Sequence, residues 1–252
     1  MAKKSTNTGK IRVGIGGWTF EPWRGVFYPD GLAQKRELEF ASRALTSIEI
    51  NGTFYSTFKP DSWRKWHDET PDDFVFAVKA SRYCTNRKEL ASAGPSIEKF
   101  MAQGLSELGP KLGPINWQFA NTKRFDAADF EAFLELLPKK QDGLALRHAL
   151  EVRHESFASP EFVKLAQKHK VAICYATGKD VPTIDEPSGG FTYARIMTAR
   201  EDLTDGFEAK ELKQIAKQAQ GWAKEGDAFV YFISGAKERN PAAAQALIKQ
   251  LG

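Results

Sequence analysis

Residues 47–51 read Ser-Ile-Glu-Ile-Asn, and residues 149–154 read Ala-Leu-Glu-Val-Arg-His. Each stretch begins as a short apolar run typical of a buried strand, and each ends in charged or polar residues. A carboxylate at the end of a core strand is costly to desolvate unless it is paired or used in chemistry. Two such ends, about a hundred residues apart, predict one site built from distant strands, as at the C-terminal mouth of a barrel.

Six further runs share this strand-like composition. They recur about every thirty residues, which is the length of one βα unit. The repeat therefore predicts an α/β fold, a single (β/α)8 barrel of the TIM type. The eight runs are residues 11–15, 47–50, 74–78, 114–119, 149–152, 171–175, 191–196 and 228–233.

Most intervals between the runs carry a helical pattern. An apolar stripe from Ile97 to Leu108 predicts one helix that stops at Gly109. Asp126 and Ser159 stand where two other helices would be capped. The interval of residues 178–190 is rich in Gly and Pro and shows no apolar periodicity, so we expect a long loop there. The sixth βα unit would then lack a regular helix.

The composition is that of an ordinary globular protein. The 252 residues are 42% hydrophobic and 27% charged, and no apolar run approaches the roughly 20 residues needed to cross a bilayer. We expect residues 1–10 to form a disordered basic tail and residues 11–252 to form the barrel domain. Cys84 and Cys174 suggest free thiols in a reducing compartment, so we expect a cytoplasmic protein without membrane association.

Strand alternation sorts the side chains at the predicted mouth, because successive residues of a strand point to opposite faces. If Ile48 and Ile50 face the helices, Glu49 points into the barrel. Such positions are unusually ionic here, since a barrel interior is typically filled with branched aliphatic side chains. Applied to every strand end, the rule gives one inward set: Glu49, Asn51, Lys79, Gln118, Glu151, Arg153 and Arg195.

Two interpretations of this ionic set are open. In the first, Glu49 and Glu151 supply a catalytic acid and base, with His154 as a proton shuttle. Arg153 and Arg195 then bind an oxyanion through their remaining guanidinium donors. In the second, the cations only neutralise the two glutamates in a structural ion network, and the histidine is tied to a neighbouring carbonyl. The sequence does not say which glutamate would be the acid.

An aromatic loop follows the first predicted strand. Trp18, nearest the strand end, is the candidate for stacking on a sugar or base. Tyr55 adds a donor from a neighbouring loop. The other rings, Trp23, Phe27 and Tyr28, are expected to pack on one another as an Ω-loop.

The sequence favours neither a metal nor a cofactor, with a hard-cation site on Glu49 and Glu151 as the alternative left open. Metal-dependent barrels need His and acidic ligands at several strand ends, but only four His occur, and of these only His154 ends a predicted strand. Residues 14–18, Gly-Ile-Gly-Gly-Trp, lack the Gly-x-Gly-x-x-Gly spacing of a nucleotide-binding turn.

Several segments occur in an order typical of a known family: residues 14–18, 49–51 with 53–55, 74–79, 111–114 with 118–119, 151–157 and 231–232. The order resembles that of the YecE-like family, an uncharacterised group catalogued as domain of unknown function 72. The resemblance extends over essentially the whole chain. It implies a TIM-type barrel without an established reaction.

The leading functional hypothesis is a metal-independent, hydrolase-like enzyme that acts on a small anionic or sugar-like substrate. The net charge of +4 and the pI near 8.9 permit an anionic partner. One alternative is a nucleic-acid-binding or processing protein, and another is a barrel that binds a small ligand without turnover. The oligomeric state cannot be read from the sequence.

Overall fold

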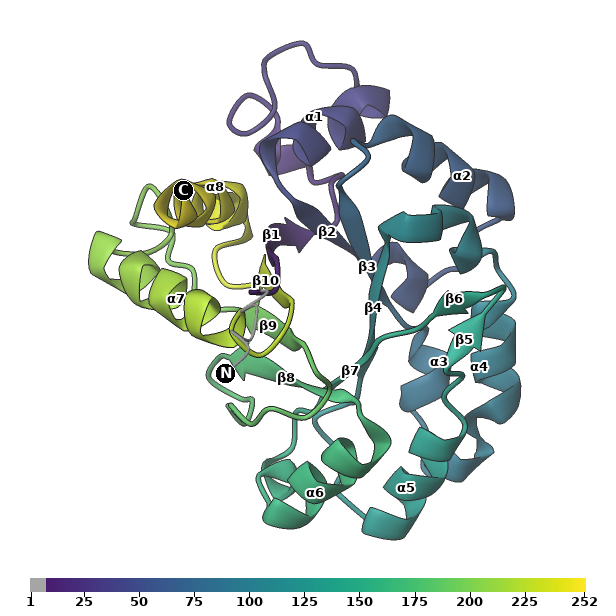
Figure 1. Ribbon diagram of the computed structural model, residues 1–252. Helices are drawn as coiled ribbons and strands as arrows, with labels where there is room; N and C mark the ends of the chain where they lie inside the picture. Colours follow the sequence, from purple (N-terminus) through teal and green to yellow (C-terminus); the bar gives the residue numbers. More distant parts are fainter. Residues whose placement is uncertain (1–7) are drawn as a thin grey trace, which may run out of the picture.

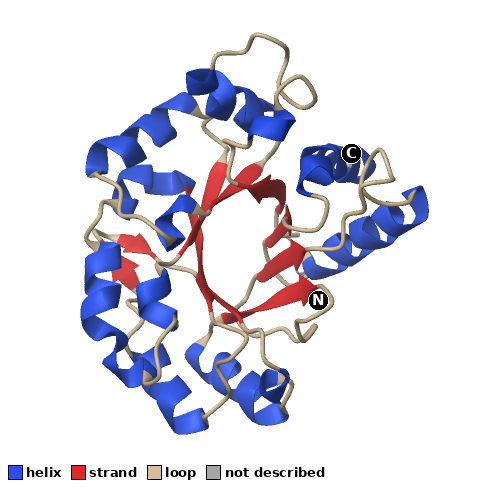
Figure 2. Cartoon of the chain, turned by 180° about the vertical axis from the view of Figure 1, so that it is seen from behind, coloured by secondary structure: helices blue, strands red, loops and turns tan. Residues whose placement is uncertain are grey.

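The computed structural model describes residues 8–252, in which eight parallel strands close into a barrel surrounded by helices (Figure 1, Figure 2). Each strand pairs with its neighbours in chain order, and β1 closes the ring against β10. The predicted α/β barrel of the TIM type is therefore confirmed. The barrel strands are β1 (Ile11–Gly16), β2 (Ser47–Ile50), β3 (Val75–Lys79), β4 (Leu112–Gln118), β7 (His148–Glu151), β8 (Ala172–Thr177), β9 (Thr192–Ile196) and β10 (Ala228–Phe232).

The helices lie outside this ring of strands (Figure 2). They are α1 (Glu37–Ala44), α2 (Pro60–Glu69), α3 (Arg82–Thr85), α4 (Gly94–Met101), α5 (Ala127–Glu135), α6 (Pro160–His169), α7 (Ala209–Trp222) and α8 (Asn240–Leu251). Two further strands, β5 (Lys140–Gln141) and β6 (Leu144–Ala145), form a small antiparallel pair that the sequence did not predict. Within residues 8–252, no helix is both long and apolar enough to cross a membrane.

The helix starts follow the sequence signals. Asp126 accepts a hydrogen bond from the Asp129 amide (2.9 Å) at the start of α5. Ser159 accepts one from the Phe162 amide (3.2 Å) at the start of α6. Such caps satisfy amide groups that have no partner inside the helix, and both predicted caps are confirmed.

A loop stands in place of a helix between β8 and β9, as predicted. Ile184 of this loop is buried, and Asp185 accepts a hydrogen bond from Trp222 Nε1 of α7 at 2.9 Å. Ser188 Oγ accepts a hydrogen bond from the Ile173 amide of β8, also at 2.9 Å. The loop therefore covers this part of the barrel wall through its own contacts.

The apolar stripe from Ile97 to Leu108 does not form one helix, so this prediction was wrong. The helix α4 ends at Met101, Gly104 follows with a φ of 102°, and a separate 3-10 turn begins at Leu105. Glycine adopts a positive φ without a steric penalty, which is why the chain changes direction there. The apolar pattern nevertheless continues, because Leu105 and Leu108 are fully buried in the turn.

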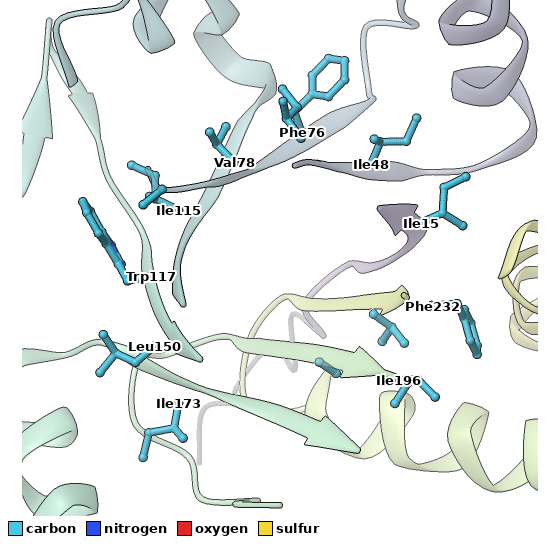
Figure 3. Close-up of a cluster of buried hydrophobic side chains, with 14 of the residues drawn as sticks. Ile15, Ile48, Phe76, Val78, Ile115, Trp117, Leu150, Ile173, Ile196 and Phe232 are labelled. Carbon is cyan, nitrogen blue, oxygen red and sulfur yellow. The ribbon is translucent and has the colours of Figure 1, made fainter. Parts of the chain in front are cut away.

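Side chains alternate between two environments along the strands. Ile48, Val78 and Leu150 point outward into the layer between strands and helices (Figure 3), which holds most of the apolar core. The alternate positions, such as Ala77 and Cys174, face the barrel axis and pack with one another there. Alternation therefore sorts the residues as predicted, and it leaves the inward positions at the C-terminal strand ends to polar side chains.

The predicted disordered tail, residues 1–10, lies partly outside the described residues 8–252. Within the described part, the Gly9 amide donates to the Ala223 carbonyl at 2.7 Å. The Lys10 amide donates to Asp227 Oδ1 at 2.9 Å. Gly9 and Lys10 are therefore hydrogen-bonded to the segment between α7 and β10.

Gly14 of β1 provides a test of how closely the strands pack. A Cβ at Gly14 would lie 1.8 Å from the carbonyl oxygen of Ser47 in β2, so Gly14→Ala forces these strands apart. We expect the free energy of unfolding, measured by urea denaturation, to fall by about 3 kcal/mol or more. The control is Gly221→Ala in α7, where a Cβ meets nothing within 4 Å. It should add about 0.5–1 kcal/mol, because alanine favours a helix. Equal stability of the two variants would contradict the close strand contact.

Candidate functional site

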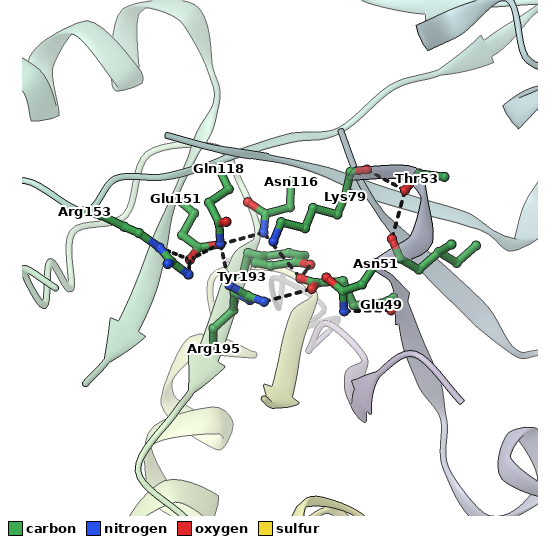
Figure 4. A network of polar contacts seen from close by, with 11 residues as sticks. Glu49, Asn51, Thr53, Lys79, Asn116, Gln118, Glu151, Arg153, Tyr193 and Arg195 are labelled. Atoms are coloured by element: carbon green, nitrogen blue, oxygen red, sulfur yellow. Dashed lines mark hydrogen bonds and ion pairs between the residues drawn. The ribbon is translucent and has the colours of Figure 1, made fainter. Parts of the chain in front are cut away.

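The inward side chains of five strands meet at the C-terminal mouth of the barrel (Figure 4). The strand register sets them beside one another, since Lys79 stands opposite Asn116 and Gln118 stands opposite Glu151. Asn116 and Tyr193 also belong to this group. Each lies two residues before a predicted inward residue, Gln118 or Arg195, and therefore shares its strand face. We call the group the mouth network: Glu49, Lys79, Asn116, Gln118, Glu151, Arg153, Tyr193 and Arg195.

Arg195 lies at the centre of the mouth network. Its Nη1 donates to Glu151 Oε2 at 2.6 Å, and its Nη2 donates to Glu49 Oε1 at 3.1 Å. Arg195 is 2% exposed and both glutamates are fully buried. One guanidinium therefore joins two carboxylates that have no contact with solvent.

Glu151 is saturated with hydrogen-bond donors. Its Oε1 accepts from Arg153 Nε (3.0 Å), Arg153 Nη2 (2.7 Å) and Gln118 Nε2 (2.7 Å). Its Oε2 accepts from Asn116 Nδ2 (3.0 Å) in addition to Arg195. Burial alone would raise the pKa of Glu151, but the neighbouring Arg195 and Arg153 outweigh burial and hold this pKa well below its usual range. A carboxylate offers about four lone-pair sites, so Glu151 has none left for a substrate proton.

The side chains that contact the Glu49 carboxylate are likewise all hydrogen-bond donors. Besides Arg195, its partners are the Tyr193 hydroxyl and Asn116 Nδ2, the latter at 3.3 Å. Burial raises the pKa of Tyr193 well above its ordinary value, so the phenol keeps its proton and stays a donor. The geometry of both glutamates fits the structural ion network better than an acid–base pair. The catalytic roles of Glu49 and Glu151 stay predictions.

Unused donors remain on the arginines. Among the described residues, Arg195 Nε is buried without a hydrogen-bond partner, and so is Asn116 Oδ1. Arg153 uses Nε and Nη2 on Glu151, and its side chain is 32% exposed. Arg153 and Arg195, the predicted oxyanion-binding pair, thus already use several of their donors on Glu151. Anion binding by these two arginines stays a prediction.

Lys79 has the fewest polar contacts of any member of the mouth network. It is 7% exposed, and its Nζ lies 4.1 Å from the centroid of the Phe54 ring. Within residues 8–252 its ammonium donates no hydrogen bond to a protein acceptor. Burial, with a smaller contribution from Arg195, lowers the pKa of Lys79 to about 8. Lys79 therefore changes its charge close to neutral pH.

A cavity of about 500 Å³ opens at the mouth beside the network. A second hollow of about 570 Å³ adjoins it and carries Arg87, Lys88, Lys123 and Arg124 on its wall. We call the first one the mouth cavity. It is lined by Phe54, Asn86, Gln118, Phe119, Ala120, Asn121, Arg153, Gly178, Lys179, Asp180, Val181, Met197 and Ser234.

His154 and Asn51 lie apart from the centre of the network. His154 Nδ1 accepts from the Ser156 amide at 3.1 Å and caps a 3-10 turn, so the ring is tied to a neighbouring amide instead of a carbonyl. Its role as a proton shuttle stays a prediction. Asn51 leaves the strand conformation, and its Nδ2 makes a long bond of 3.4 Å to the Glu49 carbonyl.

The two aromatic candidates differ in accessibility. Trp18 packs edge-on against Trp66, with ring centroids 5.3 Å apart, and also contacts Phe76 of the outer core. Tyr55 is 65% exposed on the rim, where the Arg82 guanidinium lies 5.9 Å from its ring centroid. Tyr55 is therefore better placed than Trp18 to meet a ligand, and both binding roles stay predictions.

The described residues 8–252 hold no group of three or more His, Cys, Asp or Glu side chains arranged to bind a metal ion. Fold and site together define a TIM-type barrel with a layer of buried ion pairs at its mouth. The chain belongs to the family described as "Protein of unknown function DUF72", whose model matches residues 12–252. The predicted YecE-like membership is confirmed.

Two named relatives share part of the sequence. The UPF0759 protein YecE of Escherichia coli is 27% identical over 150 residues, which are 58% of this chain and 50% of YecE. The match thus spans half the length of that relative. The UPF0759 protein YunF of Bacillus subtilis is 26% identical over 220 residues, which are 85% of this chain and 73% of YunF.

Solved structures of the same family share the fold. A DUF72 family protein of Thermotoga maritima superimposes with a TM-score of 0.77 at 22% identity, covering 96% of this chain and 97% of that one. A DUF72 family protein of Enterococcus faecalis gives a TM-score of 0.70 at 15% identity, covering 97% and 99%. At these identities the likeness supports the barrel and says nothing of a reaction.

Replacing Arg195 tests the central ion pairs. Arg195→Ala leaves two buried carboxylates without their shared cation, so we expect the free energy of unfolding to fall by about 3–5 kcal/mol. Arg200→Ala is the control, because Arg200 pairs with Glu211 on the surface, with exposed fractions of 42% and 39%. It should cost less than about 1 kcal/mol. Similar denaturation midpoints for the two variants would show that Arg195 does not hold the glutamates.

Lys79→Met tests the buried charge through its pH dependence. The pKa of Lys79 is about 8 in the folded protein and 10.5 ordinarily, so the unfolded chain binds more protons between these values. The wild type therefore gains stability as the pH rises from 8 to 10.5. At pH 7 the variant should be more stable by about 1–3 kcal/mol, and this advantage should shrink across that window.

The control for that experiment is Lys65→Met, which removes a lysine whose side chain is 62% exposed. It should change the free energy of unfolding by less than about 1 kcal/mol at any pH in the window. Denaturant titrations of both variants at several pH values give the comparison. If Lys79→Met lowers stability at every pH, the buried ammonium is stabilising and the assignment is wrong.

Proposed function

We propose that this protein binds a small organic anion, bearing a carboxylate or phosphate group, in the mouth cavity. The observation that carries the proposal is a surplus positive charge. In the mouth network the carboxylates of Glu49 and Glu151 are balanced by the guanidiniums of Arg195 and Arg153. The ammonium of Lys79 is then left over, without a carboxylate of its own. A bound anion would neutralise it.

The wall of the mouth cavity supports the same proposal. Arg153 lines the cavity, and its Nη1 donates no hydrogen bond to another described residue. Lys179 adds an exposed cation, and Asp180 beside it is the acidic member of the lining. A volume of about 500 Å³ suits a small metabolite, since ligand pockets commonly measure about 300–1,000 Å³.

Amide groups on the wall favour a ligand that also carries hydroxyl groups. Asn86, Gln118 and Asn121 present side chains that both donate and accept hydrogen bonds. A sugar-like anion would satisfy them together with Arg153. Chemistry by Glu49 and Glu151 has weaker support than binding, because the described side chains that contact these carboxylates are all hydrogen-bond donors of the network. From the hydrolase-like hypothesis we therefore keep only the substrate class, a small anionic or sugar-like molecule.

A second candidate, nucleic-acid binding, is favoured by the rim. Tyr55 and Tyr83 are 65% and 62% exposed, and the Arg82 guanidinium lies 5.9 and 5.4 Å from their ring centroids. Exposed rings beside a cation could stack on unpaired bases. Against this candidate, Lys123 is already bonded to Asp129 and to the Lys88 carbonyl. Binding of single-stranded oligonucleotides that falls steeply with salt would favour it.

The cellular compartment is a separate proposal. Cys84 and Cys174 are both buried and unpaired. Burial raises the pKa of the Cys84 thiol to about 12, so this thiol stays protonated and unreactive. Free buried thiols support a reducing compartment such as the cytoplasm.

Calorimetric titration at low ionic strength tests the proposed function. Inorganic phosphate and short hydroxycarboxylates serve as probes, and we expect one of them to bind in a one-to-one ratio. Arg153→Ala should weaken that binding by about 1.5–3 kcal/mol, because it removes a charged hydrogen-bond donor.

The matched control is Lys224→Ala, which removes an exposed charge just before β10, at the N-terminal end of the strands. It should leave the dissociation constant unchanged. If both variants weakened binding equally, the binding would depend only on the net charge of the protein, and the proposal would be overturned. Turnover of a bound probe would separate an enzyme from a barrel that only binds.

A further inference from the structure

Two lysines within residues 8–252 are buried, and they differ in how they are held. Lys111 is 3% exposed, and its Nζ donates to the carbonyls of His67 (2.6 Å) and Thr70 (2.8 Å). Such a lysine is a structural cross-link between segments. Lys79 is 7% exposed and has no such acceptor among the described residues. The fold therefore buries most of the Lys79 side chain without using its amine to hold the chain.

The surroundings of Lys79 are those of an amine prepared to react. Its Nζ lies over the Phe54 ring at 4.1 Å, and Phe54 also lines the mouth cavity. Figure 4 shows the side chain extending from the end of β3 beside Asn116 toward the centre of the network. A lysine becomes nucleophilic when burial or a neighbouring cation disfavours its ammonium form. Lys79 has both, since its side chain is nearly buried and Arg195 lies in the same layer.

The charge balance of the network fits a neutral amine. Two carboxylates and two guanidiniums cancel, so loss of the proton from Lys79 leaves the layer without net charge. The lowered pKa of about 8 has the same physical origin. At pH 8, roughly a hundredfold larger fraction of Lys79 is neutral than of a lysine with the ordinary value.

We propose that Lys79 attacks the carbonyl carbon of a small anionic aldehyde or ketone in the mouth cavity and forms an imine with it. This inference rests on the proposed function, because Arg153 would hold the anionic group of that same ligand. A carbonyl compound with a neighbouring carboxylate or a phosphate ester has the required chemistry.

The step balances without an oxidant or a metal. The neutral amine adds to the carbonyl carbon, so a C–N bond forms. The C–O bond then breaks, and the oxygen leaves as water with the two protons of the amine. When the imine takes up one proton from solvent, it carries the same single positive charge as the ammonium that it replaces. The protonated imine therefore restores to the mouth network the positive charge that is absent while Lys79 is a neutral amine.

Reductive trapping tests the inference on the full chain. The probes are glyoxylate and pyruvate, each added with sodium cyanoborohydride at pH 8, and peptide mass spectrometry locates the reduced adduct. We expect one adduct per chain, on Lys79, formed at least about tenfold faster than on Lys224. The trapping rate should rise with pH around 8, following the neutral amine. Lys79→Met should abolish the adduct, and Lys224→Met should retain it.

A neutral probe separates the failure of this inference from failure of the proposed function. Propanal carries the carbonyl without the anion. Trapping of all probes on Lys79 at equal rates, unaffected by Arg153→Ala, would support the reactive amine and overturn anion binding. Calorimetric binding of phosphate with no preferential labelling of Lys79 would support the proposed function and overturn the imine. Uniform labelling of surface lysines, with Lys79 unmodified, would likewise overturn it.

Discussion

The contact of the Arg195 guanidinium with Glu49 and Glu151 is the constraint on which the mouth of this barrel depends. Both carboxylates are fully buried, and neither strand that carries them supplies a strong cation of its own inside the barrel. Isolated carboxylates in such surroundings would be strongly destabilising. The strand β9 supplies Arg195, which pairs with both carboxylates, and Arg153 just after β7 adds a second guanidinium to Glu151. Asn116 and Tyr193 donate further hydrogen bonds. The polar layer is therefore stable only as a whole.

That constraint also determines which groups remain for chemistry. A carboxylate that accepts from several donors at once resists protonation, so the glutamates mainly set the electrostatic potential of the mouth. The groups with unused capacity are the outer edge of Arg153 and the amine of Lys79. Glu49 and Glu151, the most conspicuous residues in the sequence, thus have a supporting role in the function proposed here. Lys79, which the sequence offered only as a counter-ion, is the reactive group of the inferred chemistry.

Much of this arrangement could be predicted from the sequence, because it depends on local periodicity. Alternation along short strands is a rigid rule, so it placed Glu49, Glu151 and Arg195 inside the barrel. Which donor meets which acceptor depends instead on the register between strands, and a single strand does not carry that information. The break at Gly104 in the helix predicted from Ile97 to Leu108 could not be predicted either, because the side-chain pattern does not encode it. The apolar stripe continues through the turn, and only the backbone angle reveals the break.

The long sequence separation within the charged layer has a consequence for folding. Glu49 and Arg195 are 146 residues apart, and β1 pairs with β10 only when both ends of the domain are present. Contacts of such separation require large loops to close before they stabilise anything, and they slow the search for the native topology. Until β9 brings Arg195 into place, both glutamates must stay hydrated, because water is then their only source of hydrogen-bond donors of sufficient strength. Water therefore remains at the mouth of the partly folded barrel. Expulsion of this water and closure of the ring are thereby coupled into one late step.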